Sequence, residues 1–112
     1  MLSSIHVDHI GIAARDPGAS AAFYRDVLGL VPVPGEGPGV HLGLGGATLV
    51  IGARGADEVV GPRGRGEHFA FRVAGGIEET TSALATAGVA FERVRNRLYV
   101  QDPDGYVIEL VC

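Results

Sequence analysis

Among the residues whose types bind metal ions, His9, His68 and Glu109 are the candidate ligands of one site. Neutral imidazole and ionised carboxylate are both good ligands for Fe(II), Mn(II), Zn(II), Ni(II) or Co(II). Three protein ligands leave coordination positions open for substrate and water, as in catalytic sites. The residue types therefore predict one divalent metal ion held by His9, His68 and Glu109.

The strands expected around these residues place them on one face. Those strands are predicted over residues 5–13, 67–73 and 106–111. Successive side chains of a strand point to opposite faces, so the large apolar residues turn toward the helices. His9, His68 and Glu109 then share the opposite, concave face of a curved sheet. Arg72 shares a face with His68 and is a candidate for binding a substrate carboxylate or phosphate; a salt bridge at the rim is the alternative.

An internal repeat organises the chain. A constant spacing of 59 residues separates His9 from His68, Gly29 from Gly88, and Gly46 from Gly105. One register without a gap indicates duplication of a single unit. We expect an α+β fold of two tandem βαβββ units whose curved mixed sheets form an incomplete barrel. The units are predicted at about 1–53 and 67–112, joined by a Gly-rich linker at 54–66.

Each unit has the same predicted order of elements. In the first, Asp16 caps a helix that begins at Pro17 and runs to Leu28, with Gly29 as its C-terminal cap. Its remaining strands are expected at residues 30–33, 40–44 and 48–51. In the second, a helix at 77–87 closes at Gly88. The strands that follow are expected at residues 91–94, 98–101 and 106–111, with a tight turn over Asp102–Gly105.

Composition limits the function classes. The chain has 112 residues, a net charge of −4 and nine basic residues, all of them Arg. A net acidic chain argues against nucleic-acid binding, and the absence of Lys excludes a Schiff-base mechanism. No apolar run is long enough to span a membrane, and no signal peptide is expected. The lone Cys112 suits a reducing compartment, so we expect a cytoplasmic protein.

Four segments together resemble the vicinal oxygen chelate superfamily, which includes glyoxalase I, extradiol dioxygenases and bleomycin resistance proteins. These segments are Val7–Ile12, Phe23–Leu30, Glu67–Phe71 and Asp102–Leu110. The resemblance covers nearly the whole chain and implies a single domain of this superfamily over 1–112. It also implies a homodimer, often with units exchanged, in which His9 of one chain joins His68 and Glu109 of the other.

The resemblance implies metal ligands at His9, His68 and Glu109. Some members carry a fourth ligand, which the repeat places at Val50, so the four-ligand glyoxalase I pattern is not met. Extradiol dioxygenases have an active-site Tyr near the position of Tyr99. Tyr99 is thus a candidate catalytic or substrate-binding residue, with a pocket wall as the alternative. The repeat aligns His41 with Val100, on the face opposite Tyr99, and His41 is interpreted as a bystander.

These observations predict a metal-dependent enzyme acting on a small molecule with two neighbouring oxygens. Glu109 and Tyr99 are the candidate catalytic residues. The reaction class stays open between a glyoxalase- or epimerase-type lyase or isomerase and an extradiol-type dioxygenase. The alternative is a metal-free, bleomycin-resistance-like protein that sequesters a ligand. A third hypothesis is a regulatory or immunity role without turnover.

Overall fold

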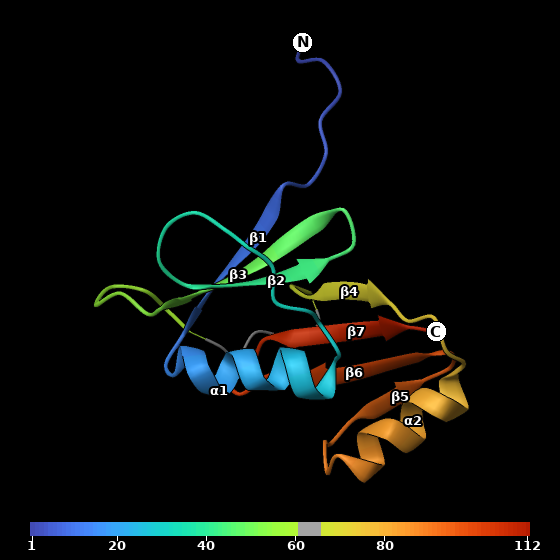
Figure 1. Cartoon of the computed structure of the whole chain (residues 1–112). Coiled ribbons are helices and arrows are strands. Elements are labelled where there is room, and N and C mark those ends of the chain that lie inside the picture. Colours follow the sequence, from blue (N-terminus) through green and yellow to red (C-terminus); the bar gives the residue numbers. More distant parts are fainter. Residues whose placement is uncertain (61–65) are drawn as a thin grey trace. The chain divides into compact units, whose positions relative to one another are not determined.

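The structure is a computed structural model that describes residues 1–60 and 66–112. The chain divides into two compact units, Met1–Val60 and Gly61–Cys112. The division falls inside the stretch predicted as a linker, of which residues 61–65 lie outside the described residues. Each unit is an α+β structure with one mixed, open sheet (Figure 1).

The first unit contains a three-stranded sheet. Its elements are β1 (His9–Ala14), α1 (Pro17–Ala22), the π-helix η1 (Phe23–Val27), β2 (Val40–Leu44) and β3 (Ala47–Ala53). The strand order is β1-β3-β2. β1 runs parallel to β3, and β2 and β3 form an antiparallel hairpin. The alternation of apolar residues buries Leu42, Leu49 and Ile51, and these pack with the helix residue Tyr24 in the core.

The helix begins at the predicted Pro17 and ends at Val27, one residue before the predicted end at Leu28. The Asp16 side chain accepts a hydrogen bond of 3.1 Å from the Ala19 amide, and Pro17 occupies the first turn. Pro suits this position because the first amides of a helix have no partner within it. The second half is a π-helix rather than the expected α-helix. Gly29 follows with φ +78°, a left-handed conformation that favours glycine.

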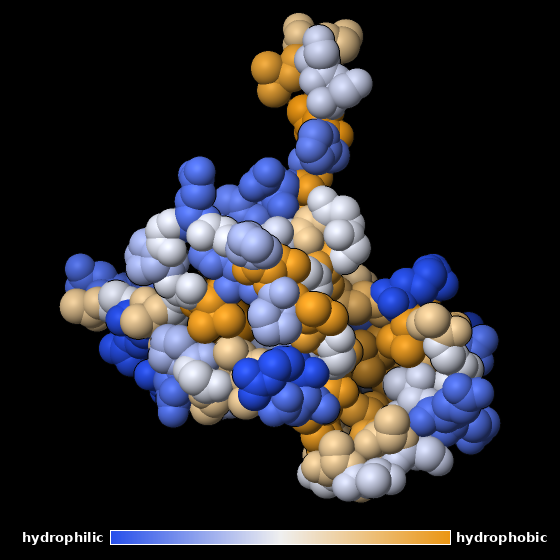
Figure 2. All heavy atoms as spheres, in the orientation of Figure 1, coloured by the Kyte–Doolittle hydropathy of each residue, from blue (hydrophilic) through white to orange (hydrophobic). Residues whose placement is uncertain are grey.

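Two strand predictions in the first unit need correction. The first strand starts at His9, not at residue 5, because pairing with β3 begins at His9 opposite Thr48. Residues 1–8 extend from β1, and their apolar side chains are exposed (Figures 1 and 2). The strand expected at 30–33 is only a bridge between Pro32 and Leu42. Prolines at 32 and 34 lack the amide protons that a longer ladder needs.

The second unit contains the complete βαβββ order. Its elements are β4 (Phe69–Arg72), α2 (Ile77–Thr86), β5 (Glu92–Val94), β6 (Arg97–Gln101) and β7 (Val107–Val111). The strand order is β4-β7-β6-β5, with β4 and β7 parallel and the other pairs antiparallel. β4 is shorter than the predicted 67–73, and β6 begins one residue earlier than expected. Leu98, Val100, Ile108 and Leu110 form the apolar core.

The two units repeat the same parallel register. Gly11 pairs with Val50 in the first unit, and Ala70 pairs with Glu109 in the second. Val50 therefore occupies the position equivalent to Glu109, as the repeat predicts. None of the described helices is long and apolar enough to cross a membrane.

A substitution at Gly88 tests whether a glycine is needed where α2 ends. Gly88 has φ +71°, and a Cβ added there would meet no atom within 4 Å. Replacement by Ala should therefore cost only the backbone strain, about 1–2 kcal/mol of unfolding free energy. Urea denaturation of Gly88→Ala measures this cost. Gly52→Ala, at an equally open strand position without positive φ, is the control. Equal stability of the two variants would contradict the argument.

Candidate functional site

Side chains from three strands form a row across one face of the second sheet. Tyr99 pairs with Glu109, and Glu109 with Ala70, across β6, β7 and β4. Paired residues of neighbouring strands point to the same face. The same face carries a second row, two residues further along β4 and β7. This second row consists of Arg72, Val111, Arg97 and Val94.

Glu109 is the centre of this face. Its side chain is only 7% exposed, which is unusual for a carboxylate without a partner. The Arg97 Nη1 group donates a hydrogen bond to Glu109 Oε2. The Tyr99 hydroxyl donates one of 2.9 Å to Oε1, and His68 Nε2 lies 3.2 Å from the same oxygen. Both carboxylate oxygens are therefore engaged by donors within the unit.

These contacts favour the ionised form of Glu109. The hydrogen bond from Arg97 is the largest effect and lowers the pKa of Glu109 below its ordinary value of 4.5. Burial opposes the shift, and the Tyr99 hydrogen bond adds to it. The same contact raises the pKa of Arg97. The pair is thus a negative charge fixed in the sheet and a cation whose side chain is 52% exposed.

His68 and Tyr99 enclose the Oε1 side of the carboxylate. Their rings meet edge to face, with centroids 6.1 Å apart and an interplanar angle of 75°. The His68 side chain is 30% exposed, so one side of the imidazole faces solvent. Since Tyr99 contacts a predicted site residue directly, it is part of the Glu109 cluster, which we define as His68, Arg97, Tyr99 and Glu109.

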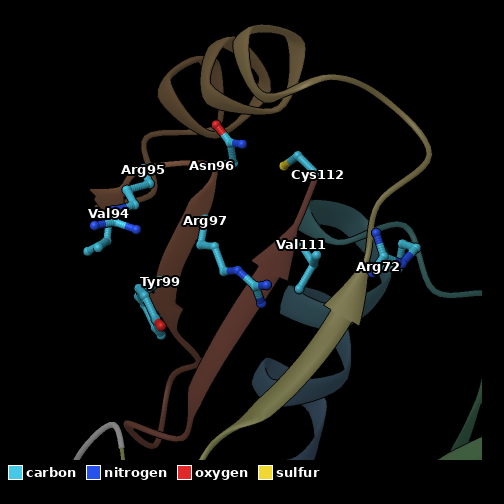
Figure 3. A pocket seen from close by; sticks show the side chains of 8 residues that line it. All are labelled: Arg72, Val94, Arg95, Asn96, Arg97, Tyr99, Val111 and Cys112. Atoms are coloured by element: carbon cyan, nitrogen blue, oxygen red, sulfur yellow. The ribbon is translucent and has the colours of Figure 1, made fainter.

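A cavity of about 610 Å³ opens beside the Glu109 cluster (Figure 3). Arg72, Val94, Arg97, Tyr99 and Val111 line it from the sheet face. Arg95 and Asn96, in the turn between β5 and β6, and the terminal Cys112 complete the wall. The lining is basic and partly apolar. Such a volume suits a small-molecule ligand.

The donors in the second unit do not fit a divalent ion while Arg97 holds the carboxylate. Within residues 66–112, no third His, Cys, Asp or Glu joins His68 and Glu109 in a group that could bind a metal. His9, the third predicted ligand, belongs to the first unit. There its Nδ1 lies 2.8 Å from Asp8 Oδ2, and its side chain is 57% exposed. The three-residue metal site therefore stays a prediction.

Sequence reasoning missed Arg97. It is one of three Arg residues in the segment 93–97. It does not belong to any of the residue pairs that define the repeat. The available signal was its place two residues before Tyr99, which puts both side chains on one face of a strand.

The position of His41 also needs correction. His41 pairs with Val50 as Tyr99 pairs with Glu109. It is therefore equivalent to Tyr99, not to Val100. The hairpin turn of the second unit is one residue longer than that of the first, which shifts the spacing from 59 to 58 along this strand.

Comparison with known proteins agrees with this architecture. Residues 6–110 match the model of the Glyoxalase/Bleomycin resistance protein/Dioxygenase superfamily. The chain belongs to this superfamily. No curated protein matches the chain in sequence.

Several solved structures share the fold. A protein from Bacillus anthracis, whose name places it in the glyoxalase family, has a TM-score of 0.78 and 27% identity, covering 98% of this chain and 97% of that one. A protein from the mobile metagenome of V. Pseudocholerae has a TM-score of 0.79 and 18% identity, covering 98% and 95%. TnmS3, an antibiotic binding protein from Streptomyces sp. CB03234, has a TM-score of 0.76 and 20% identity, covering 99% and 98%.

The lowered pKa of Glu109 predicts a specific acid sensitivity. A carboxyl whose pKa is lower in the folded state stabilises the fold above its unfolded pKa, and this contribution is lost as the pH falls through the folded pKa. The unfolding free energy of the wild type should therefore fall more steeply than that of Glu109→Gln as the pH is lowered from 7 through the region below 4.5. Urea denaturation across this range measures both. Parallel curves would show that Glu109 has the same pKa in both states.

Proposed function

We propose that the chain is a small-molecule-binding protein whose ligand occupies the cavity beside the Glu109 cluster without a bound metal ion. The observation that carries the proposal is the ion pair between Arg97 and Glu109. It places a cation at the carboxylate that the sequence predicts as a metal ligand. A guanidinium is permanently charged and offers donors in a planar fork that matches a carboxylate, so the buried negative charge is compensated by the chain itself.

The geometry of the carboxylate supports this reading over metal binding. A metal ion bound through Oε2 would compete with the charge-assisted hydrogen bond from Arg97, and one bound through Oε1 would share that oxygen with the Tyr99 hydroxyl. Charge-assisted hydrogen bonds are among the stronger ones in proteins. The displaced cation would also remain close to the metal, and like charges in a partly buried site repel each other. Both effects lower the affinity of the site for a divalent ion.

The cavity has the properties of a ligand site. It combines apolar surface from Val94, Val111 and the Tyr99 ring with polar groups at defined positions. Apolar walls with a few oriented polar groups are typical of small-molecule sites. TnmS3, which has the same fold, is an antibiotic binding protein; the fold therefore accommodates ligand binding as a function.

The second candidate is the metal-dependent enzyme. It is favoured by the 3.2 Å approach of His68 Nε2 to Glu109 Oε1, which brings two of the predicted ligands together. His9, His68 and Glu109 would hold the ion, with His9 contributed by a second copy if the units are exchanged in a homodimer. The ion would supply a Lewis acid for a substrate with neighbouring oxygens. This candidate requires Arg97 to rotate away from Glu109, which its exposed side chain permits.

Metal content separates the two candidates. Protein purified without a His-tag, then incubated with Mn(II), Fe(II), Co(II), Ni(II) or Zn(II) and desalted, should contain far less than one ion per chain, because Arg97 already compensates Glu109. Elemental analysis measures the content. His9→Ala and Glu109→Gln should then behave as the wild type does. One ion per chain, lost in both variants and retained in the control His6→Ala, would establish the metal site instead.

A further inference from the structure

We propose that the ligand of this site carries an anionic group, a carboxylate or a phosphate, and that Arg72 and Arg97 bind it together. The inference rests on the proposed function and names its ligand class. It follows from the positions of the two guanidinium groups, from the hydrogen bonds that they lack, and from the charge of the cavity lining.

The two arginines occupy one row of the sheet. Arg72 of β4 and Arg97 of β6 both pair with Val111 of the intervening strand β7. Neighbouring strands lie about 4.8 Å apart, so the two backbones are about 10 Å apart at this row. Figure 3 shows Arg97 reaching toward Val111 from one side, with Arg72 on the other side of it. Long side chains at this separation can converge on one group placed above Val111.

Most N–H donors of the Arg72 and Arg97 guanidinium groups make no hydrogen bond with the described residues. Arg97 uses Nη1 for Glu109, and its other N–H groups make no hydrogen bond with the described residues. The Arg72 and Arg95 guanidinium groups have no hydrogen bond or ion pair with any residue in 1–60 or 66–112. By contrast, Arg25 and Arg93, which lie outside the cavity, have Asp26 and Glu78 as partners. Among the described residues, Arg72 and Arg95 therefore line the cavity without an acidic partner, whereas Arg97 is paired with Glu109.

The charge of the lining selects the ligand class. Three arginines line the cavity, and no Asp or Glu is among its lining residues. Of the three arginines, only Arg97 is paired with Glu109. The chain as a whole carries a net charge of −4, so the basic lining is a local feature. A guanidinium fork binds carboxylate and phosphate oxygens in pairs. The Glu109 contact holds Arg97 in place beforehand, which reduces the entropy lost when the anion binds.

The test uses four probes that share an aromatic ring and differ in charge. Phenyl phosphate and benzoate are anionic, benzyl alcohol is neutral, and benzylamine is cationic. Titration calorimetry in a low-salt buffer containing a chelator measures binding to the wild type, Arg72→Gln and Arg93→Gln. Arg93 is the matched control because it lies on the opposite face of β5, opposite the buried Leu98. Circular dichroism and urea denaturation check that the variants are folded.

We expect at least one anionic probe to bind more tightly than both uncharged and cationic probes. Loss of one charge-assisted hydrogen bond should weaken its binding about 10- to 100-fold in Arg72→Gln, with no change in Arg93→Gln. The comparison of phenyl phosphate with benzoate distinguishes the two anion types. The inference is overturned if benzyl alcohol binds as tightly as the anions, if Arg72→Gln binds them as the wild type does, or if no anion binds either with the chelator or after a divalent ion replaces it.

The same experiment separates this inference from the proposed function. Binding of benzyl alcohol without anion preference, in the presence of chelator, would overturn the anion assignment and leave metal-free binding intact. Anion binding that depends on Arg72 but occurs only after a divalent ion replaces the chelator would overturn metal-free binding and support the anion assignment.

Discussion

Parallel pairing between the first and last strands of each unit is the constraint on which the site depends. A helical segment and at least one further strand lie between these strands, so the pairing closes a long stretch of chain. In the second unit it sets Ala70 opposite Glu109 and Arg72 opposite Val111. A slip of one residue would turn Glu109 into the apolar core and Ile108 onto the face that now carries Glu109. Because that exchange is costly, the register is well defined, and so are the neighbours of Glu109.

The ion pair at Glu109 adds a chemical constraint to this geometry. A carboxylate that is 7% exposed needs compensation for the water it has lost. Arg97 and Tyr99 provide it from the neighbouring strand, while His68 approaches from the segment before β4. The consequence is that the Glu109 carboxylate orients the Arg97 guanidinium. The same constraint therefore links the packing of the sheet to the charges beside the cavity.

Sequence patterns predicted the parts that depend on local regularity. The repeat and the alternation of apolar residues predicted the α+β fold, both helices and the shared face of His68 and Glu109. Helix caps at Asp16 and Gly29 were readable because each residue type has a specific backbone or hydrogen-bonding role. The π-helical turn was not predicted. The shortened strand near Pro32 was missed as well, although the prolines at 32 and 34 lack the amide protons that a longer ladder needs.

The role of Arg97 was out of reach for a different reason. Its contact with Glu109 depends on the antiparallel register of β6 and β7, and that register depends on the length of the turn between them. The spacing of 59 residues holds along the paired strands β3 and β7 but becomes 58 along β2 and β6. An alignment without gaps therefore placed His41 one residue away from its true equivalent, Tyr99.

This difference in turn length has an evolutionary meaning. The second hairpin contains one more residue in its turn, yet His41 and Tyr99 keep the same face of their strands. The connection between the helix and this strand is one residue shorter in the second unit, which balances the extra residue of the turn. Turn length and connection length therefore differ between the two units in opposite directions, while the strand pattern is the same. The two halves could in this way acquire different side chains at an equivalent position, a histidine in one and a tyrosine in the other, without rebuilding either sheet.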